Sequence, residues 1–326
     1  MKLIKIDKDS GIPLMGAIAF GIIDRGTNLI QIRSTSVCNL NCPFCSVDSG
    51  SCSRLHGVNY EVDCGYLLNW IKEVCEFKGD GVEANIDSVG EVGTYKDLLK
   101  LVKGLKQIKQ IKFISMQTNG CFLTEKVVDD LIEAGLDRIN FSVHSLDEER
   151  AKMLAGVDTF DISKIKTVIE YISTQDIELF LTPVWMPKVN DDDIVEIIKF
   201  GISLGARLGI QKYEEYKYSR KMKKAKQMTY FKFYRQLKLW EKEFDVELVL
   251  SRQKMNIVKM ERVPSVFEKG DKVNVLIKCR GWINGQMIGV ASDRCITVNK
   301  CLVKVGDMVR VKIVENKNNI YLADVL

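Results

Sequence analysis

The spacing of apolar residues alternates between two periods over the first two thirds of the chain. Short runs rich in β-branched residues predict buried strands. The segments between them repeat apolar residues every three or four positions, as a helix buried on one side does. The predicted strands are residues 27–33, 82–87, 111–116, 137–143, 177–184 and 207–211. Six strands that alternate with helices predict an α/β fold with parallel strands.

Helix boundaries carry their own signals in this region. Thr94, with Asp97 three residues later, predicts a capping box at a helix start. Thr124 and Asn190 predict two further helix starts, because their side chains can accept from the unpaired N–H groups of a first turn. Two more segments with a helical period are residues 66–76 and 162–174.

The pattern changes after Gln211. Residues 213–243 predict a long basic helix rich in aromatic residues. From Val266 onward short strands alternate with glycine-containing turns, which predicts a small all-β barrel. The predicted organisation is an N-terminal extension, an α/β core, a basic helical segment with a linker, and a β-barrel, at residues 1–26, 27–215, 216–264 and 265–326.

Composition narrows the setting of the protein. The chain has 326 residues and ten cysteines, five of them between positions 38 and 64. In a long intracellular chain such cysteines indicate metal or cluster chemistry rather than disulfides. The apolar run at residues 16–23 is too short to span a bilayer, and no signal peptide is visible. We therefore expect a cytoplasmic protein with no membrane partner.

A cysteine motif follows the first predicted strand. Residues 38–45 read CNLNCPFC, so Cys38, Cys42 and Cys45 have the spacing C-x3-C-x2-C. Three thiolates on one tight loop can bind three irons of a cubane cluster and leave the fourth iron without a protein ligand. An open metal position can bind a cofactor or substrate directly. A zinc site or a chance grouping of cysteines is the alternative.

This motif resembles the signature of the radical S-adenosylmethionine (SAM) superfamily. The resemblance implies a [4Fe–4S] cluster whose open iron is chelated by the amino and carboxylate groups of SAM. It implies an external one-electron donor of the flavodoxin or ferredoxin type, whose electron leads to a 5′-deoxyadenosyl radical. It also implies a partial (β/α)6 barrel rather than a flat doubly wound sheet, followed here by the small all-β barrel.

The resemblance extends to other predicted strand ends, where barrel enzymes build their sites. Gly90-Glu91 matches the family segment that meets the SAM amino group, although Ser88, Val89 and Val92 depart from the usual residues. The cofactor-binding residues that the resemblance implies are Phe44, Gly90, Glu91, Thr118, Asn119, Asn140, Ser142, Pro183 and Gln211.

Several candidate residues also have a structural interpretation. Asn119-Gly120 is typical of a plain turn. Radical hydrogen abstraction needs no general base, so we assign no catalytic role to His56 or His144. Cysteine is often simply buried. We interpret six cysteines outside the motif in that way: Cys52, Cys64, Cys121, Cys279, Cys295 and Cys301.

Charge is unevenly distributed along the chain. Residues 1–211 carry −7, residues 212–242 carry +8 and residues 265–326 carry +4. An acidic front and a basic back predict that the back meets a polyanion, with a solvated helix face as the alternative. Residues 217–226 hold six basic side chains, and aromatic residues flank them. Such side chains suit phosphates and unpaired bases.

The tail resembles a TRAM domain, a small RNA-binding β-barrel. The matching segments are GDKV at 270–273, GQMIG at 285–289 and VGDMVRVKI at 305–313. The predicted RNA-binding residues, from the basic segment and the tail, are Lys217, Arg220, Lys221, Lys223, Lys224, Lys272, Lys278, Arg280, Arg294, Lys304 and Arg310.

These features predict a radical SAM enzyme that modifies RNA, with tRNA as the expected class. The expected chemistry is hydrogen abstraction at an unactivated carbon, followed by methylation or a related group addition. The main alternative is a radical SAM enzyme that acts on a protein or a metabolite. A further alternative is a non-catalytic cluster protein that binds RNA and senses redox state.

Overall fold

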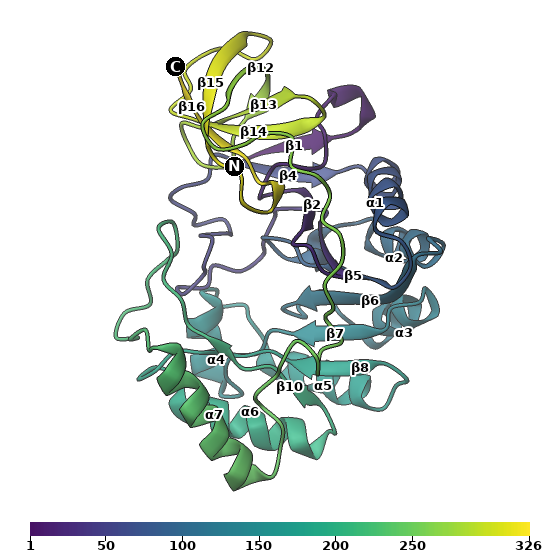
Figure 1. Ribbon diagram of the computed structural model, residues 1–326. Helices are drawn as coiled ribbons and strands as arrows, with labels where there is room; N and C mark the ends of the chain where they lie inside the picture. The colour runs from purple at the N-terminus through teal and green to yellow at the C-terminus, as the bar shows by residue number, and fades with distance from the viewer. The chain divides into compact units, whose positions relative to one another are not determined.

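A computed structural model describes residues 1–326 of the protein (Figure 1). The chain divides into two compact units, and neither is one continuous stretch of sequence. The first unit consists of Met1–Val37, Arg54–Ile114 and Val258–Leu326, and the second consists of Cys38–Ser53 and Ser115–Ile257. No helix is both long enough and apolar enough to cross a membrane.

The α/β part of the first unit contains two separate strand pairings and two helices. Its elements are β1 (Lys2–Ile6), β2 (Gly21–Asp24), β3 (Leu29–Arg33), β4 (Val58–Val62), α1 (Cys64–Lys78), β5 (Val82–Ile86) and α2 (Leu98–Lys106), with 3₁₀ turns at Lys8–Ser10 and Val92–Thr94. Strand β3 pairs with β5 in parallel and with β2 in the antiparallel sense. Strands β1 and β4 form a parallel pair, and α1 packs against α2.

The second unit continues the alternation of strands and helices. Its elements are α3 (Glu125–Glu133), β7 (Arg138–Phe141), α4 (Glu148–Ala155), α5 (Ile162–Ser173), β8 (Glu178–Leu181), β9 (Val184–Trp185), α6 (Asp191–Ser203), β10 (Arg207–Leu208), β11 (Gln211–Lys212) and α7 (Tyr230–Phe244). Strand β6 (Ile111–Thr118) begins in the first unit and ends in the second. The order β6-β7-β8-β10 is parallel throughout, so the carboxyl ends of these strands lie at one edge.

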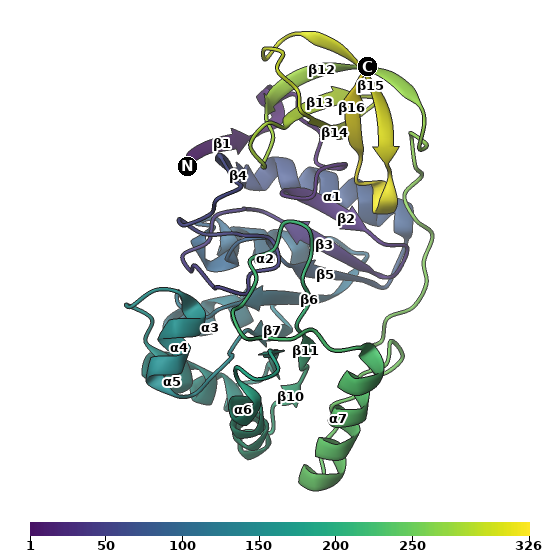
Figure 2. The same cartoon turned by 90° about the vertical axis from the view of Figure 1, so that its left-hand side faces the viewer.

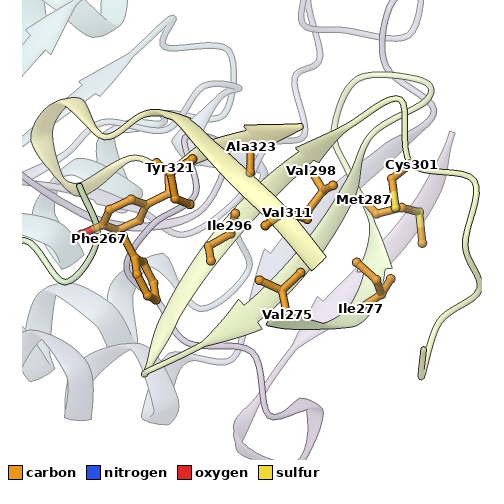
Figure 3. Packing of buried hydrophobic residues seen from close by; sticks show 11 residues of the cluster. Phe267, Val275, Ile277, Met287, Ile296, Val298, Cys301, Val311, Tyr321 and Ala323 are labelled. Atoms are coloured by element: carbon orange, nitrogen blue, oxygen red, sulfur yellow. The ribbon is translucent and has the colours of Figure 1, made fainter. Parts of the chain in front are cut away.

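The C-terminal part of the first unit is a closed five-stranded barrel, in the order β12-β13-β14-β16-β15. Its strands are β12 (Lys272–Arg280), β13 (Met287–Ala291), β14 (Arg294–Asn299), β15 (Met308–Glu315) and β16 (Leu322–Val325), with a 3₁₀ turn at Lys317–Asn319. Alternate residues such as Val275, Ile277 and Val311 point into one apolar core (Figure 3). The predicted small all-β barrel is confirmed.

This barrel is joined to the N-terminal segment within the first unit. The Cys295 amide donates to the Met15 carbonyl over 2.8 Å, and the Tyr321 amide donates to the Gly16 carbonyl over 3.1 Å. The ring of His56 stacks on Trp282, with 3.8 Å between ring centroids. Residues 1–26, which the sequence suggests as an extension, therefore supply β1, β2 and contacts to the barrel.

The six predicted core strands are found, as β3, β5, β6, β7, β8 and β10. The capping box at Thr94 is wrong. Its hydroxyl donates to the carbonyls of Glu91 and Val37, over 2.7 and 3.2 Å, and α2 begins only after Asp97. Thr94 lies in the 3₁₀ turn Val92–Thr94, three residues before the helix cap at Asp97, so it is too early in the chain to cap α2.

The long helix predicted over residues 213–243 is also wrong in its first half. Helix α7 begins at Tyr230, with Thr229 as its cap, and residues 213–229 have no regular structure (Figure 2). Tertiary contacts of this irregular segment with the cysteine motif override the helical propensity of its lysines. Strands β1, β2 and β4 and helix α4 have no counterpart among the predicted elements.

Candidate functional site

The cysteine loop opens the second unit. Cys38, Cys42 and Cys45 are all half-buried, and no cysteine of the chain forms a disulfide. The Cys45 amide donates to the Cys42 carbonyl over 3.1 Å, which closes a tight turn between two of the three thiols. Gly50 has φ near 101°, and a Cβ there would lie 2.0 Å from the Leu40 carbonyl oxygen. The loop is therefore compact, and it folds back on itself only because a glycine stands at this position.

The electrostatics of the loop suit a cluster. Burial raises the pKa of the Cys42 thiol, the neighbouring Cys38 and Cys45 raise it further, and Arg220 lowers it. A thiol with a raised pKa keeps its proton until a metal binds, and bound iron would neutralise the charge of the three thiolates. The structure brings no three His, Cys, Asp or Glu side chains close enough for a single metal ion. A cubane instead takes its three thiolates at three different irons, so the donor set fits a cluster.

Phe44 lies in an apolar cluster beside the cysteines. It packs with Leu154, Met186 and Tyr213, and its ring meets the His144 ring edge-on, with 4.8 Å between centroids. The structure thus surrounds Phe44 with apolar and aromatic side chains, and its predicted place near the adenine stays a prediction.

His144 is held in its neutral form. Its Nδ1 accepts from the Val184 amide over 3.1 Å, and burial lowers its pKa from 6.5 to about 4. A neutral ring that accepts at Nδ1 carries its proton at Nε2. His144 therefore packs against Phe44 in a fixed orientation and does not act as a proton acceptor near neutral pH.

A polar group links three adjacent strands at their carboxyl ends. The Gln117 amide nitrogen donates to Ser142 Oγ over 2.6 Å and to Thr182 Oγ1 over 2.9 Å. Thr182 Oγ1 also donates to the Phe141 carbonyl over 3.1 Å. Ser142 is in the predicted set of cofactor-binding residues, and Gln117 and Thr182 are not. Their positions at the ends of two predicted strands were the available signal.

The turn after β6 connects this strand to the cysteine loop. The Asn119 amide nitrogen donates to Asn39 Oδ1 over 2.9 Å, and Asn119 Oδ1 accepts from the Cys121 amide over 3.0 Å. Thr118 Oγ1 accepts from the Gly120 amide over 3.0 Å. Thr118 and Asn119 thus shape a turn, and Asn119 also holds a residue between the first two cysteines of the motif.

The Gly90-Glu91 segment belongs to the first unit. The Glu91 amide donates over 2.7 Å to the carbonyl of Val37, the residue that precedes Cys38. Glu91 is buried, and its Oε1 accepts from the Gly93 amide over 2.9 Å. Nearby in sequence, the Ser88 hydroxyl is buried without a hydrogen-bond partner. Such a group is expected where a polar ligand completes the site, so this segment fits the SAM contact that the resemblance implies.

The backbone packing around position 90 requires a glycine there. A Cβ at this position would lie 2.0 Å from the Val37 carbonyl oxygen. The glycine is therefore required by the chain that leads into the cysteine motif, whatever space SAM needs.

The cysteine loop and the strands around it match a known family. Residues 32–201 match the sequence model of the radical SAM superfamily. The chain belongs to the radical SAM superfamily. Members of this superfamily are enzymes, and this one uses SAM and a [4Fe–4S] cluster.

Relatives of this radical SAM chain include an uncharacterized protein and GTP 3′,8-cyclases. An uncharacterized protein of Methanocaldococcus jannaschii is 37% identical over 342 residues, which cover 97% of this chain and 79% of the relative. A probable GTP 3′,8-cyclase of Saccharolobus islandicus is 35% identical over 182 residues, which cover 56% of this chain and 54% of the relative. The chain thus spans about half the length of the GTP 3′,8-cyclases that it matches.

Solved structures share the radical SAM fold. Native anSMEcpe with bound AdoMet aligns with a TM-score of 0.56 at 19% identity, over 80% of this chain and 74% of that chain. Streptococcus suis SuiB bound to S-adenosylmethionine aligns with a TM-score of 0.52 at 18% identity, over 66% of this chain and 47% of that chain. At these identities the likeness concerns the fold alone.

Three more of the predicted SAM-binding residues lie at or next to strands β7, β9 and β11. They are Asn140, Pro183 and Gln211. Asn140 is buried on β7 and lies opposite Gln117 in the strand register. The Pro183 carbonyl accepts from the Gln211 amide over 2.7 Å, while the Gln211 side chain is exposed. Their predicted roles stay predictions.

Most of the predicted RNA-binding side chains are exposed, but three are not. Lys278 is half-buried. Arg294 is half-buried and donates to the Asp293 and Pro264 carbonyls over 3.0 and 3.5 Å. Arg220 is half-buried and directs its guanidinium at the cysteine loop. The Arg220 guanidinium thus donates to the cysteine loop, and its predicted phosphate contact stays a prediction.

Two of the other cysteines differ from the expected burial. Cys52 is exposed and Cys121 is half-buried. Cys52 lies in the cysteine loop, where its amide donates to Asn41 Oδ1 over 2.8 Å. A polar loop with little apolar content offers such a residue no core to enter.

Proposed function

We propose that this radical SAM enzyme modifies RNA, with tRNA as the expected class, at an unactivated carbon by methylation or a related group addition. Cys38, Cys42 and Cys45 hold three irons of the cluster, and Ser88, Gly90 and Glu91 contact SAM. When cluster and SAM are bound, they supply the radical that takes a hydrogen atom from the substrate. An external one-electron donor of the flavodoxin or ferredoxin type reduces the cluster.

The observation that carries this proposal is a row of cations on the barrel. Lys272 on β12 lies directly opposite Lys312 on β15, and Arg310 lies opposite Asn274 in the same register. All three basic side chains are exposed. On its other side Lys312 lies opposite Asp324 of β16, whose carboxylate offsets part of the repulsion between the two lysines. A bound phosphate backbone would neutralise the remaining positive charge and gain from counterion release. We call Lys272, Arg310 and Lys312 the cation row.

An aromatic surface on the second unit supports RNA rather than another polyanion. Tyr230, Phe231 and Tyr234, at the start of α7, are 58%, 74% and 41% exposed, whereas Phe233 beside them is buried. The Lys212 ammonium lies 4.8 Å from the centre of the Tyr230 ring. Exposed aromatic rings among cations can stack on unpaired bases, at about 1–3 kcal/mol per base. The likeness of the tail to a TRAM domain, read from its sequence, agrees with this interpretation.

The test is tRNA binding by the full-length protein as a function of salt concentration. The double variant Lys272→Glu/Arg310→Glu should bind tRNA more weakly. Its slope of log affinity against log salt should be shallower by about one for each lost phosphate contact. The matched control is Lys103→Glu on α2, an exposed lysine outside the barrel, which should bind tRNA as the wild type does. Wild-type affinity and slope in the double variant would contradict the proposal.

A purine nucleotide is the second candidate substrate, and the GTP 3′,8-cyclase relatives favour it. Formation of 5′-deoxyadenosine by the anaerobic, cluster-loaded protein separates the two candidates. Under the RNA proposal tRNA raises the rate of this reaction, and GTP does not. Stimulation by GTP and not by tRNA would contradict the RNA proposal and would favour a nucleotide as the substrate.

A further inference from the structure

Arg220 donates hydrogen bonds to acceptors on four residues of the cysteine loop. Its amide donates to the Cys45 carbonyl over 2.9 Å. Its guanidinium donates to the Cys42 carbonyl over 3.1 Å, to the Ser49 carbonyl over 2.7 Å and to Asp48 Oδ1 over 2.5 Å. Two of these carbonyls belong to predicted cluster ligands. One residue from a distant part of the sequence thus fixes the turn between them.

The same loop supplies a hydrogen bond to a ligand sulfur. The Ser49 amide lies 3.3 Å from Cys45 Sγ, with the geometry of an N–H···S bond. Arg220 holds this peptide from both sides, since it binds the Asp48 carboxylate and the Ser49 carbonyl. Asp48 has φ near 55°, a left-handed conformation that is uncommon for a non-glycine residue. An outside contact that maintains this conformation is what aims the next amide at the sulfur.

The segment that carries Arg220 is itself anchored. The Met222 amide donates to the Tyr213 hydroxyl over 2.9 Å, and Met222 packs against the apolar cluster around Phe44. The segment that contains Arg220 is therefore anchored through Tyr213 and Met222, and this anchoring fixes the position of Arg220 beside the cysteine loop.

We propose that Arg220 is a positioning residue of the cluster site: it fixes the Asp48–Ser49 peptide so that the Ser49 amide donates to the Cys45 sulfur, and thereby raises the reduction potential of the cluster. This rests on the proposed ligand role of Cys45 and is independent of the RNA proposal. Hydrogen bonds to cluster sulfurs are one of the factors that set such potentials.

Geometry, rather than charge, is the expected origin of the effect. Asp48 pairs with the guanidinium in the half-buried loop, so the two charges largely cancel at the cluster. A planar guanidinium can serve several acceptors at once in a fixed fork, and an ammonium cannot. Lysine at this position would keep the charge and lose the fork.

The experiment is a redox titration of the anaerobic, cluster-loaded full chain, followed by electron paramagnetic resonance, without RNA. We expect Arg220→Lys and Arg220→Gln to retain iron and to shift the midpoint potential to more negative values. The control Lys226→Gln changes an exposed lysine of the same segment and should keep the wild-type potential. Wild-type potentials in both Arg220 variants would overturn the proposal.

Two other outcomes are also decisive. If the Arg220 variants lose iron while thermal unfolding of the iron-free protein is unchanged, Arg220 acts on retention of the cluster rather than on its potential, which overturns the proposal. If thermal stability falls while the potential stays at the wild-type value, Arg220 is only a structural ion pair, and the proposal fails. Failure of the ligand assignment itself is distinguishable, because the wild-type protein would then hold no cubane signal.

Discussion

At Gly90 the backbone leaves no room for a side chain, because a Cβ would meet the Val37 carbonyl at 2.0 Å. We expect Gly90→Ala to lower the free energy of unfolding by about 1–3 kcal/mol, the usual cost of overpacking, measured by urea denaturation. The control is Gly65→Ala in α1, where the nearest atom is an Asp63 carboxylate oxygen at 3.4 Å. That variant should be neutral or stabilising by up to about 1 kcal/mol.

His144 makes the stability of the protein depend on pH. Burial lowers its pKa to about 4 in the folded chain, from the ordinary histidine value of 6.5. The unfolded state therefore binds more protons than the folded state between these two values. The contribution of His144 to stability is complete above pH 6.5 and is lost as the pH falls toward 4.

The variant His144→Asn isolates this contribution, since asparagine can still accept from the Val184 amide. Between pH 7 and pH 5 the wild type should lose roughly 2 kcal/mol more unfolding free energy than the variant. Urea denaturation at both pH values measures the difference. If the two proteins lose stability in parallel, His144 is not held neutral by the fold.

At the scale of elements, Asn190 begins α6 but does not cap it. Its Oδ1 accepts from the Met186 amide over 2.8 Å, and its Nδ2 donates to the carbonyls of His144 and Val184, over 3.1 and 3.0 Å. Asn190 is fully buried. It therefore joins the end of β9 to the segment after β7 instead of serving its own helix.

We expect Asn190→Ala to lower the free energy of unfolding by about 2–4 kcal/mol, because the substitution leaves several buried polar groups without hydrogen-bond partners. The comparison is Thr124→Ala in α3. The Thr124 hydroxyl accepts from the Val127 amide in the ordinary way, so its loss should cost about 1 kcal/mol. Equal losses in urea denaturation would mean that Asn190 acts as a simple cap.

Sequence periodicity identified elements where local signals and tertiary contacts agree. Thr124 caps α3 as predicted, since its hydroxyl accepts from the first turn of that helix. Residues 213–229 have helical composition but no helix, because Arg220 and Met222 find partners in the cysteine loop and around Phe44. A partner that is distant in sequence leaves no local signal, so period and propensity could not reveal this segment.

At the scale of the whole molecule, the cysteine motif and the cation row belong to different units of the chain. We expect Cys42→Ala to abolish the brown cluster chromophore and 5′-deoxyadenosine formation, because two thiolates cannot hold a cubane with one open iron. Its affinity for tRNA should stay near the wild-type value, since the cation row is in the first unit. Absorption spectra, product analysis and tRNA binding measure the three effects.

The control for this variant is Cys52→Ala, which removes an exposed cysteine of the same loop and should keep the chromophore. A Cys42→Ala protein that still cleaves SAM would contradict the assignment of this cysteine.

The cysteine motif was predictable because its chemistry depends on spacing along a single loop. The tail barrel was predictable because turns punctuate its strands. The contacts around these parts were not. Gln117 and Thr182 come within hydrogen-bond distance only when β6, β7 and β8 align. Lys312 joins the cation row only because the strand register places it opposite Lys272. Such pairings depend on strand register, which composition does not encode.

The backbone bonds between the two ends of the chain also have a consequence for synthesis. Met15 and Gly16 pair with Cys295 and Tyr321, so this early segment cannot complete its backbone bonds until the tail barrel has been made. The second unit has all of its residues well before that moment. A nascent chain can therefore assemble the cysteine loop first, while residues 15 and 16 stay without their partners until the barrel strands follow.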